Sequence, residues 1–416
     1  MEIPFFKHRI YFETSFRLPD DIVRSTLQQC INSATSTNFP IFLSVLTRDE
    51  KSEYKTKELE KKAILELEDI QGESIQDIHQ QIINLCRDDY KNGFRIFFAV
   101  VRSDDKESFY LVIHAHHGIA DGFMVTSFVQ SVYNLYNNKN ALPLRFVEPS
   151  SIINHQHLSY PSSWNTENLK QSVEQTLSTL PFPSTSPSYQ TIRDTTEFHN
   201  TSRIIDSAAS QRASTTAKNY GSLYNVNGCI HGMLIDCFTR SLIHSEGITE
   251  GCMTMNTITN LRRYLKETGD LSPWLFVSSF PVSIDISKLL SHEENCATLQ
   301  RKVTQSLEEG LPLAIFLSNQ EGRSDCGEEE KRKNCLETEI SNLGLHPKEC
   351  FTRSLITQII YDNEDLAVQT ISLVVWTDLD KQIHLCGACD GKFMTKGRFD
   401  EIMDGIVREI VEFGVV

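Results

Sequence analysis

The chain has 416 residues, of which 40% are hydrophobic and 23% charged, a composition typical of a globular protein large enough for two or three domains. Its 40 Lys and Arg residues stand against 55 Asp and Glu residues, which gives a net charge of -15. This acidic balance argues against nucleic acid or an anionic membrane surface as a partner, because both favour a basic face.

The sequence shows no sign of secretion or of a membrane span. Its start, MEIPFFKHRIYFETSF, alternates like a strand and is interrupted by charge, so we expect no signal peptide. No apolar run approaches the roughly 18 residues that a transmembrane helix needs. The 11 cysteines are scattered and odd in number, which favours reduced thiols. We therefore expect a cytoplasmic protein, and a monomer.

The first part of the chain predicts strands and amphipathic helices in mixed order. Strands are predicted from alternating or β-rich runs at residues 8–18, 39–48, 63–70, 94–102 and 109–117. Helices are predicted from apolar spacing at residues 19–34, 74–90 and 123–138. The runs FRIFFAVVR and FYLVIHAHH, separated by SDDKES, predict a hairpin that ends in histidines. Residues 143–195 are rich in Pro, Ser, Thr and Asn, which indicates a linker with a short helix near 167–179.

The second part repeats this mixture. Strands are predicted at residues 196–206, 251–265, 274–286, 353–361, 366–376 and 382–390. Helices are predicted at residues 208–220, 227–244, 291–310 and 396–413, and a polar surface loop at 318–338. Cys386 and Cys389 have redox spacing in CGAC, but they lie in a predicted strand, so we expect packed core thiols. The order of elements predicts an α/β fold with large mixed sheets.

The stretch LVIHAHHGIADGF, residues 111–123, is the best candidate for a functional site. A neutral imidazole of His116 or His117 can accept a proton near neutral pH if its orientation is held. Asp121 can order the turn that follows, and Gly122 leaves room for a close approach. A metal site using His114, His116, His117 and Asp121 is an alternative, although no helical metal-ligand spacing is present. Core histidines without a function are a further alternative.

HHGIADG, residues 116–122, resembles the H-H-x-x-x-D-G motif of the chloramphenicol acetyltransferase-like superfamily, which includes condensation domains, polyketide-associated acyltransferases and alcohol acetyltransferases. NLRRYL, LFVSSFPVSID, ISNLG and IHLCGACDGKF are similar to later segments of that superfamily. Cys389 stands where those relatives have a tyrosine, and the D-F-G-W-G motif of the plant branch is absent. The resemblance implies two α/β subdomains in a V, residues 1–180 and 181–416, with a central tunnel.

The same resemblance implies roles for individual residues. His117 would be the general base, while His116 and Asp121 would be structural. Asp121 would pair with Arg262, with Arg263 as the competing partner, and Gly122 would keep the tunnel floor open. Ser341 or Asn342 would donate a hydrogen bond to the thioester oxyanion; a loop-capping role for Ser341 is an equal alternative.

The function implied is transfer of an acyl group from acyl-CoA to a hydroxyl or amine of a small acceptor, without a covalent enzyme intermediate, a metal or a permanently bound cofactor. In one variant a carrier protein supplies the donor on its phosphopantetheine arm. The other alternative is a non-catalytic binding protein on the same scaffold. Candidate cations for the CoA phosphates are Lys392, Lys396 and Arg398, and Lys331, Arg332 and Lys333.

Overall fold

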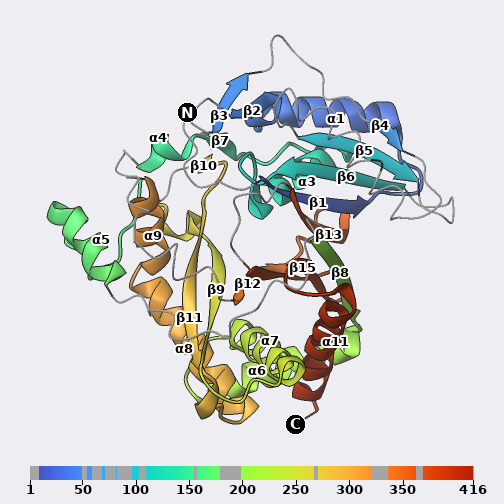
Figure 1. The fold of residues 1–416 in the computed structure, drawn as a ribbon. Coiled ribbons are helices and arrows are strands. Elements are labelled where there is room, and N and C mark those ends of the chain that lie inside the picture. Colours follow the sequence, from blue (N-terminus) through green and yellow to red (C-terminus); the bar gives the residue numbers. More distant parts are fainter. Residues whose placement is uncertain are drawn as a thin grey trace. The chain divides into compact units, whose positions relative to one another are not determined.

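The computed structural model describes residues 9–48, 54–58, 68–70, 81, 96–102, 109–153, 157–178, 198–266, 270–320, 336–361 and 369–415. The chain forms two compact units, and both combine strands with helices (Figure 1). The first unit comprises Met1–Ser159, Arg262–Phe276 and His346–Asp362, and the second comprises Tyr160–Leu261, Val277–Leu345 and Asn363–Val416. The predicted mixed α/β class is confirmed.

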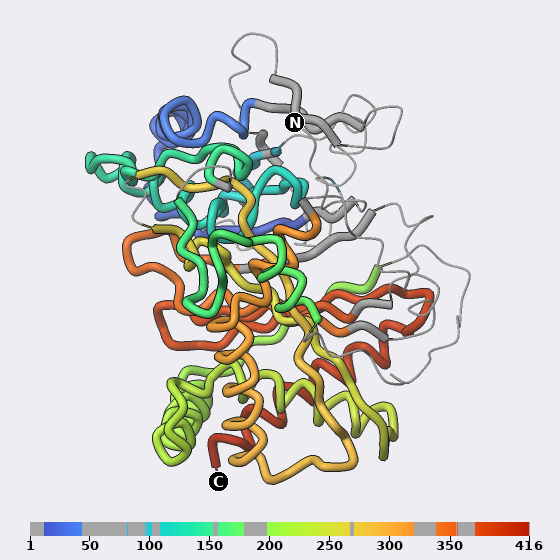
Figure 2. Tube along the Cα trace, turned by 90° about the vertical axis from the view of Figure 1, so that its left-hand side faces the viewer, coloured from blue at the N-terminus to red at the C-terminus, as the bar shows by residue number. Residues whose placement is uncertain are grey.

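The observed division differs from the boundary predicted at residue 180. Residues 160–178 belong to the second unit, and two later segments of the chain return to the first. These returns can be followed by colour along the trace in Figure 2. One of them contains β13 (Thr352–Tyr361), which pairs antiparallel with β1 (Arg9–Arg17) at the edge of the first sheet. The prediction assumed contiguous domains, whereas strand pairing depends on free backbone edges and on register.

The first unit is built on a five-stranded sheet in the order β13-β1-β6-β5-β4. Its central strand β6 (Phe109–His116) pairs antiparallel with β1 and with β5 (Phe97–Arg102), and β4 (Glu68–Ile70) pairs parallel with β5. Helices α1 (Arg24–Thr37) and α3 (Gly122–Tyr136) pack against each other.

The core of the first unit is rich in phenylalanine. Phe128 of α3 lies with its ring centroid 5.1 Å from that of Phe39, 5.0 Å from Phe42 and 5.3 Å from Phe98. All four side chains are buried, and such aromatic clusters stabilise a core through both area and edge contacts. The smaller elements of this unit are η1 (Pro40–Leu43), β2 (Ser44–Arg48), β3 (Tyr54–Glu58), β7 (Arg145–Val147), α4 (Pro149–Ile153), η4 (Leu261–Tyr264) and β10 (Leu271–Pro273).

The second unit contains a six-stranded sheet in the order β11-β9-β12-β14-β15-β8. Its strands are β8 (Phe198–Ile205), β9 (Cys252–Asn260), β11 (Val277–Asp285), β12 (Leu336–Leu345), β14 (Gln369–Thr377) and β15 (Ile383–Asp390). Its helices are η3 (Thr166–Asn168), α5 (Leu169–Leu177), α6 (Ser207–Leu223), α7 (Ile230–Glu246), η5 (Ile286–Lys288), α8 (His292–Glu308), α9 (Leu311–Gln320) and α11 (Lys396–Phe413). Alternate residues of the strands and the apolar faces of α6, α7, α8 and α11 share one core.

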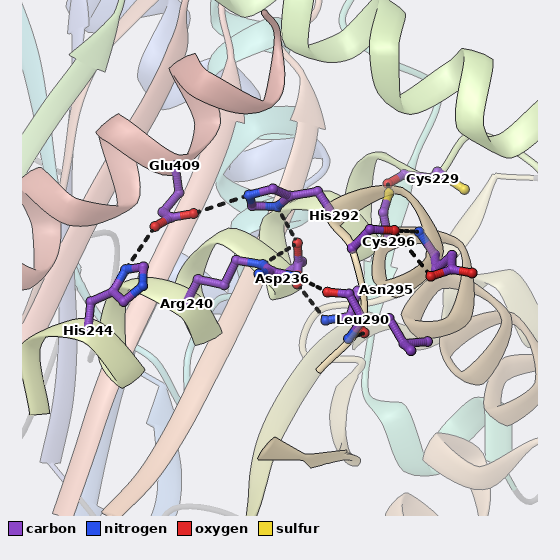
Figure 3. A network of polar contacts seen from close by, with 11 residues as sticks. Cys229, Asp236, Arg240, His244, Leu290, His292, Asn295, Cys296 and Glu409 are labelled. Atoms are coloured by element: carbon purple, nitrogen blue, oxygen red, sulfur yellow. Dashed lines mark hydrogen bonds and ion pairs between the residues drawn. The ribbon is translucent and has the colours of Figure 1, made fainter. Parts of the chain in front are cut away.

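A buried polar network joins three helices of the second unit (Figure 3). Asp236 of α7 accepts hydrogen bonds from Arg240 and from Asn295 of α8, and its Oδ2 lies 2.6 Å from His292 Nδ1. His292 Nε2 lies 3.4 Å from Glu409 Oε2 on α11. The buried carboxylates of Asp236 and Glu409 thus have polar partners inside the unit, as buried charges require.

Most predicted elements are confirmed within a few residues, with instructive exceptions. Helix α9 was missed because LPLAIFL is apolar at nearly every position, with no helical period, and residues 311–314 are all buried. Residues 261–264 form the 3-10 helix η4, not the end of a strand. The helix predicted at 74–90 lies outside the described residues except for Gln81. Among the helices of the described ranges, none combines the length and apolarity needed to cross a membrane.

Candidate functional site

The histidine stretch lies at the C-terminal end of strand β6, at one end of the first sheet. Strand β6 is the central strand of the sheet, paired with β1 and β5, and its residues from Leu111 to His116 are buried. His114 and His116 are two residues apart and therefore point to the same face of the sheet. The strand ends at His116, whose carbonyl oxygen accepts a hydrogen bond from the amide of Ile119. His117 is therefore the first residue of a tight turn.

The two strand histidines have defined neighbours. His114 Nδ1 lies 3.5 Å from Oε2 of Glu13, its direct partner on β1, and both side chains are buried. His116 Nδ1 lies 2.9 Å from the amide nitrogen of Gly118, from which it accepts a hydrogen bond. An Nδ1 that accepts leaves the ring proton of neutral His116 on Nε2. This bond links the end of β6 to the turn that follows it, and the structural role expected for His116 stays a prediction.

His117 has the properties of a general base. Its side chain is half-buried, and its ring meets the Phe12 ring edge-on at 5.6 Å between centroids. Desolvation lowers the pKa of His117 below the ordinary value of 6.5, and a hydrogen bond to its own backbone and the negative charge of Asp121 oppose this shift. The lowered pKa keeps the imidazole neutral at neutral pH, the state in which it can accept a proton.

Asp121 is fully buried and binds three N–H donors. Its Oδ1 accepts from the amide of Met124 at 2.8 Å, which makes it the N-cap of α3. Its Oδ2 accepts from Arg262 Nη1 at 2.8 Å and from the amide of Phe276 at 3.0 Å. The contact between Asp121 and Arg262 that the sequence predicted is therefore present. It connects α3 to a segment about 140 residues later in the chain, within the same compact unit.

Arg262 is held by neutral groups as well as by the carboxylate. Its Nε donates to Ser272 Oγ at 2.9 Å, and its Nη2 donates to the carbonyl oxygen of Pro273 at 2.5 Å. Its guanidinium lies 4.5 Å from the ring centroid of Phe123, the residue that follows Gly122. Arg263, the competing assignment, is exposed and lies against Tyr264. Sequence reasoning missed Ser272, whose hydroxyl lies in no motif, and the amide of Phe276, because a backbone donor is present whatever the residue type.

The residues of the metal alternative do not assemble. Among the described residues, no three His, Cys, Asp or Glu side chains are placed to hold one metal ion. His114 faces Glu13, and Asp121 is engaged by Arg262 and two amides. The donor set expected for zinc is therefore not formed around His116 and His117.

The other predicted site residues lie in the second unit. Ser341 and Asn342 are on β12, where Asn342 Oδ1 accepts from the amide of Gly344 at 3.0 Å in a local turn. The amide of Lys392 donates to Asp390. Lys396 pairs with Asp400 at 3.0 Å, and Arg398 pairs with Glu246 at 2.6 Å. The roles expected for these residues stay predictions, and Lys331, Arg332 and Lys333 lie outside the described residues.

The CGAC pair lies on β15, as predicted, and both side chains are buried. Burial raises the pKa of the Cys389 thiol, so it disfavours the reactive thiolate that a redox site requires.

Comparison with solved structures identifies the fold. No family model and no curated protein matches the chain. The trichothecene 15-O-acetyltransferase of Fusarium sporotrichioides matches with a TM-score of 0.67 at 12% identity, over 98% of this chain and 91% of that one. The first condensation domain of the CDA synthetase matches with a TM-score of 0.64 at 9% identity, over 98% and 91%. Polyketide synthase associated protein 5 of Mycobacterium tuberculosis matches with a TM-score of 0.60 at 10% identity, over 96% and 93%. The chain therefore shares its fold with an acetyltransferase and with condensation domains, which is the fold that the resemblance of its HHGIADG stretch implied.

Proposed function

We propose that this chain is an acyltransferase that moves an acyl group from a thioester to a hydroxyl or amine of a small-molecule acceptor. The observation that carries the proposal is the half-buried His117 at the end of β6, with a lowered pKa. The buried Asp121–Arg262 pair supports it, because this pair fixes the helix that begins directly after the histidine turn. The likeness in fold to an acetyltransferase and to condensation domains supports the reaction class.

The chemistry balances without a covalent enzyme intermediate. The neutral imidazole of His117 removes the proton from the acceptor hydroxyl or amine as that group attacks the thioester carbonyl. The tetrahedral intermediate collapses and expels the donor's sulfur as a thiolate. Protonated His117 returns the proton to that sulfur, so a free thiol and an ester or amide leave. His117 ends each cycle neutral, as it began.

The donor is proposed to be a thioester of CoA, or of the same pantetheine arm on a carrier protein. Both present the same reacting atoms to His117, so the imidazole does not distinguish them. The likeness to a condensation domain supports the carrier form, and the likeness to an acetyltransferase supports the CoA form.

The test is mass spectrometry of products formed from a panel of acyl-CoA thioesters, and from the same acyl groups on a carrier protein, with mixed alcohols and amines. The variant His117→Gln should lose acyl transfer by about 10²–10⁴-fold, the usual contribution of a general base. The matched control is His244→Gln, because His244 is a 74% exposed histidine in the second unit. This control should transfer at the wild-type rate.

The outcomes separate the alternatives. Products that depend on His117 support the proposed reaction, and the thioester that reacts identifies the donor. Saturable binding of a thioester without any product, in wild-type protein and in His117→Gln alike, would instead indicate the non-catalytic binding protein.

A further inference from the structure

The first unit buries a second arginine, and no described carboxylate lies against it. Arg353 is the second residue of β13, and only 4% of its surface is exposed. Its guanidinium lies 5.2 Å from the ring centroid of Phe16, its neighbour on β1. Within the part of the chain that the structure describes, no acidic side chain pairs with Arg353, and its Nε has no hydrogen-bond partner. Arg262, by contrast, meets Asp121.

Burying a cation without a carboxylate beside it usually lowers the stability of the folded state. Burial lowers the pKa of Arg353 to about 10, which shows how strongly the surroundings disfavour its charge. An apolar side chain of similar length would avoid this desolvation, and replacing buried charges by apolar residues is often neutral or stabilising. The hydrogen bond that Arg353 donates therefore explains the arginine at this position better than stability does.

That contact leads to the first turn of α3. Arg353 Nη2 donates a hydrogen bond to Thr126 Oγ1, and Thr126 Oγ1 donates to the carbonyl oxygen of Gly122 at 2.8 Å. Gly122 is the first residue of α3 and follows the N-cap Asp121 directly. The chain of bonds thus runs from the sheet edge at β13 to the end of the HHGIADG stretch.

We propose that Arg353 is a positioning residue, which fixes the first turn of α3 through Thr126 and thereby holds His117 and Asp121 in register for acyl transfer. Arg262 holds the same turn through Asp121, so two arginines fasten it at two points. Arg353 acts through Thr126, to which its Nη2 donates a hydrogen bond. The expected effect on the rate of acyl transfer rests on the proposed function, and the expected effect on the geometry of the turn rests on the hydrogen bonds.

The kinetic test compares Arg353→Met, Arg353→Lys and Thr126→Val with the wild type. We expect Arg353→Met to keep the wild-type melting temperature or exceed it, while kcat falls about tenfold, since a displacement of about 1 Å can cost up to about 100-fold. The donor KM should stay within about twofold, because substrate contacts are unchanged. Arg353→Lys should recover part of the rate, since its ammonium can still donate to Thr126.

Thr126→Val removes the middle of the chain of bonds and should reproduce the loss. The double variant Arg353→Met with Thr126→Val should be no slower than either single variant, because both act on one path. Thr239→Val is the matched control. Thr239 is buried in α7 of the second unit, and its hydroxyl has no hydrogen-bond partner among the described residues. This control should leave kcat unchanged.

A second readout does not depend on activity. The NMR titration of labelled histidine side chains, assigned with His117→Gln, follows the pKa of His117 directly. In Arg353→Met the resonance and midpoint of His117 should shift, because the charge of Asp121 moves relative to the ring, and Arg353→Lys should shift them back. A wild-type kcat and an unchanged His117 titration in Arg353→Met would overturn the proposal. A loss of melting temperature that accompanies the loss of rate, with His117 unmoved, would also overturn it in favour of a structural role. If the wild type transfers no acyl group at all, the proposed function fails, and the titration still decides the positioning role.

Discussion

The buried pair of Asp121 and Arg262 allows a quantitative prediction for the first unit. Asp121→Ala removes the carboxylate that pairs with Arg262 at 2.8 Å, and the Arg262 side chain is only 9% exposed. Leaving a buried charge unpaired costs about 3–5 kcal/mol. The same substitution removes the N-cap of α3, which costs about 1 kcal/mol more. The expected loss is therefore about 4–6 kcal/mol, against a total of about 5–15 kcal/mol for a typical domain.

Because such a loss can prevent folding, Asp121→Asn is the more informative variant. Its amide oxygen can still cap the amide of Met124, so the expected loss is about 3–5 kcal/mol from the unpaired Arg262 alone. Arg262→Met should cost a similar amount, because it leaves the carboxylate of Asp121 buried with two amide donors and no cation.

The double variant Asp121→Asn with Arg262→Met contains no unpaired buried charge. It should therefore be more stable than the sum of the two single losses predicts, with a coupling energy of about 2–3 kcal/mol. This cycle separates the pair interaction from the other effects of each substitution.

Urea unfolding followed by tryptophan fluorescence measures these differences. Trp274 lies in the first unit, close to the pair, since its carbonyl oxygen is 3.4 Å from Arg262 Nη2. Trp164 and Trp376 lie in the second unit, so replacing them by phenylalanine in a common background leaves Trp274 as the reporter. An Asp121→Asn variant within about 0.5 kcal/mol of the wild type, or losses that add without coupling, would refute the reasoning.

Three further predictions concern titration and donor binding. The acid limb of the pH profile of kcat/KM should lie below pH 6.5, because His117 must be neutral to act and burial lowers its pKa. Asp121→Asn should move this limb to still lower pH, because it removes a negative charge that raises the pKa of His117. A limb above pH 6.5 would contradict the assignment of His117 as the base. Burial lowers the pKa of His231 from 6.5 to about 4, so the unfolded chain binds more protons than the folded chain between these pH values. The free energy of unfolding should therefore fall by up to about 3 kcal/mol from pH 6.5 to pH 4. In His231→Gln this part of the fall should be missing from the acid unfolding curve. Charge reversal at Lys392, Lys396 or Arg398 should raise the donor KM more than it lowers kcat, and kinetics with an unaltered donor KM in all three would remove these cations from the donor site.

Local sequence pattern predicted many elements, because apolar periodicity reflects the face that an element buries. The spacing of Phe399, Ile402, Met403, Ile406 and Ile410 predicted the inward face of α11, and all five are buried. Helix α9 was missed for the same reason, since a helix buried on most sides shows no period. The contact between Asp121 and Arg262 was predicted through a family resemblance, not from the local pattern.

The sequence by itself determined the histidine strand end, the turn that contains Asp121 and the mixed α/β class, because these depend on residue types close together in the chain. Only the tertiary structure decided that Arg262–Phe276 and β13 join the first unit, and that Arg353 is buried there against Phe16 and Thr126. It also decided that the amide of Phe276 binds Asp121, which lies 155 residues earlier. The physical reason is that long-range pairing depends on which strand edges and backbone donors remain unpaired after local structure forms. The residues next to a given position in the sequence do not determine which of these groups will pair with it.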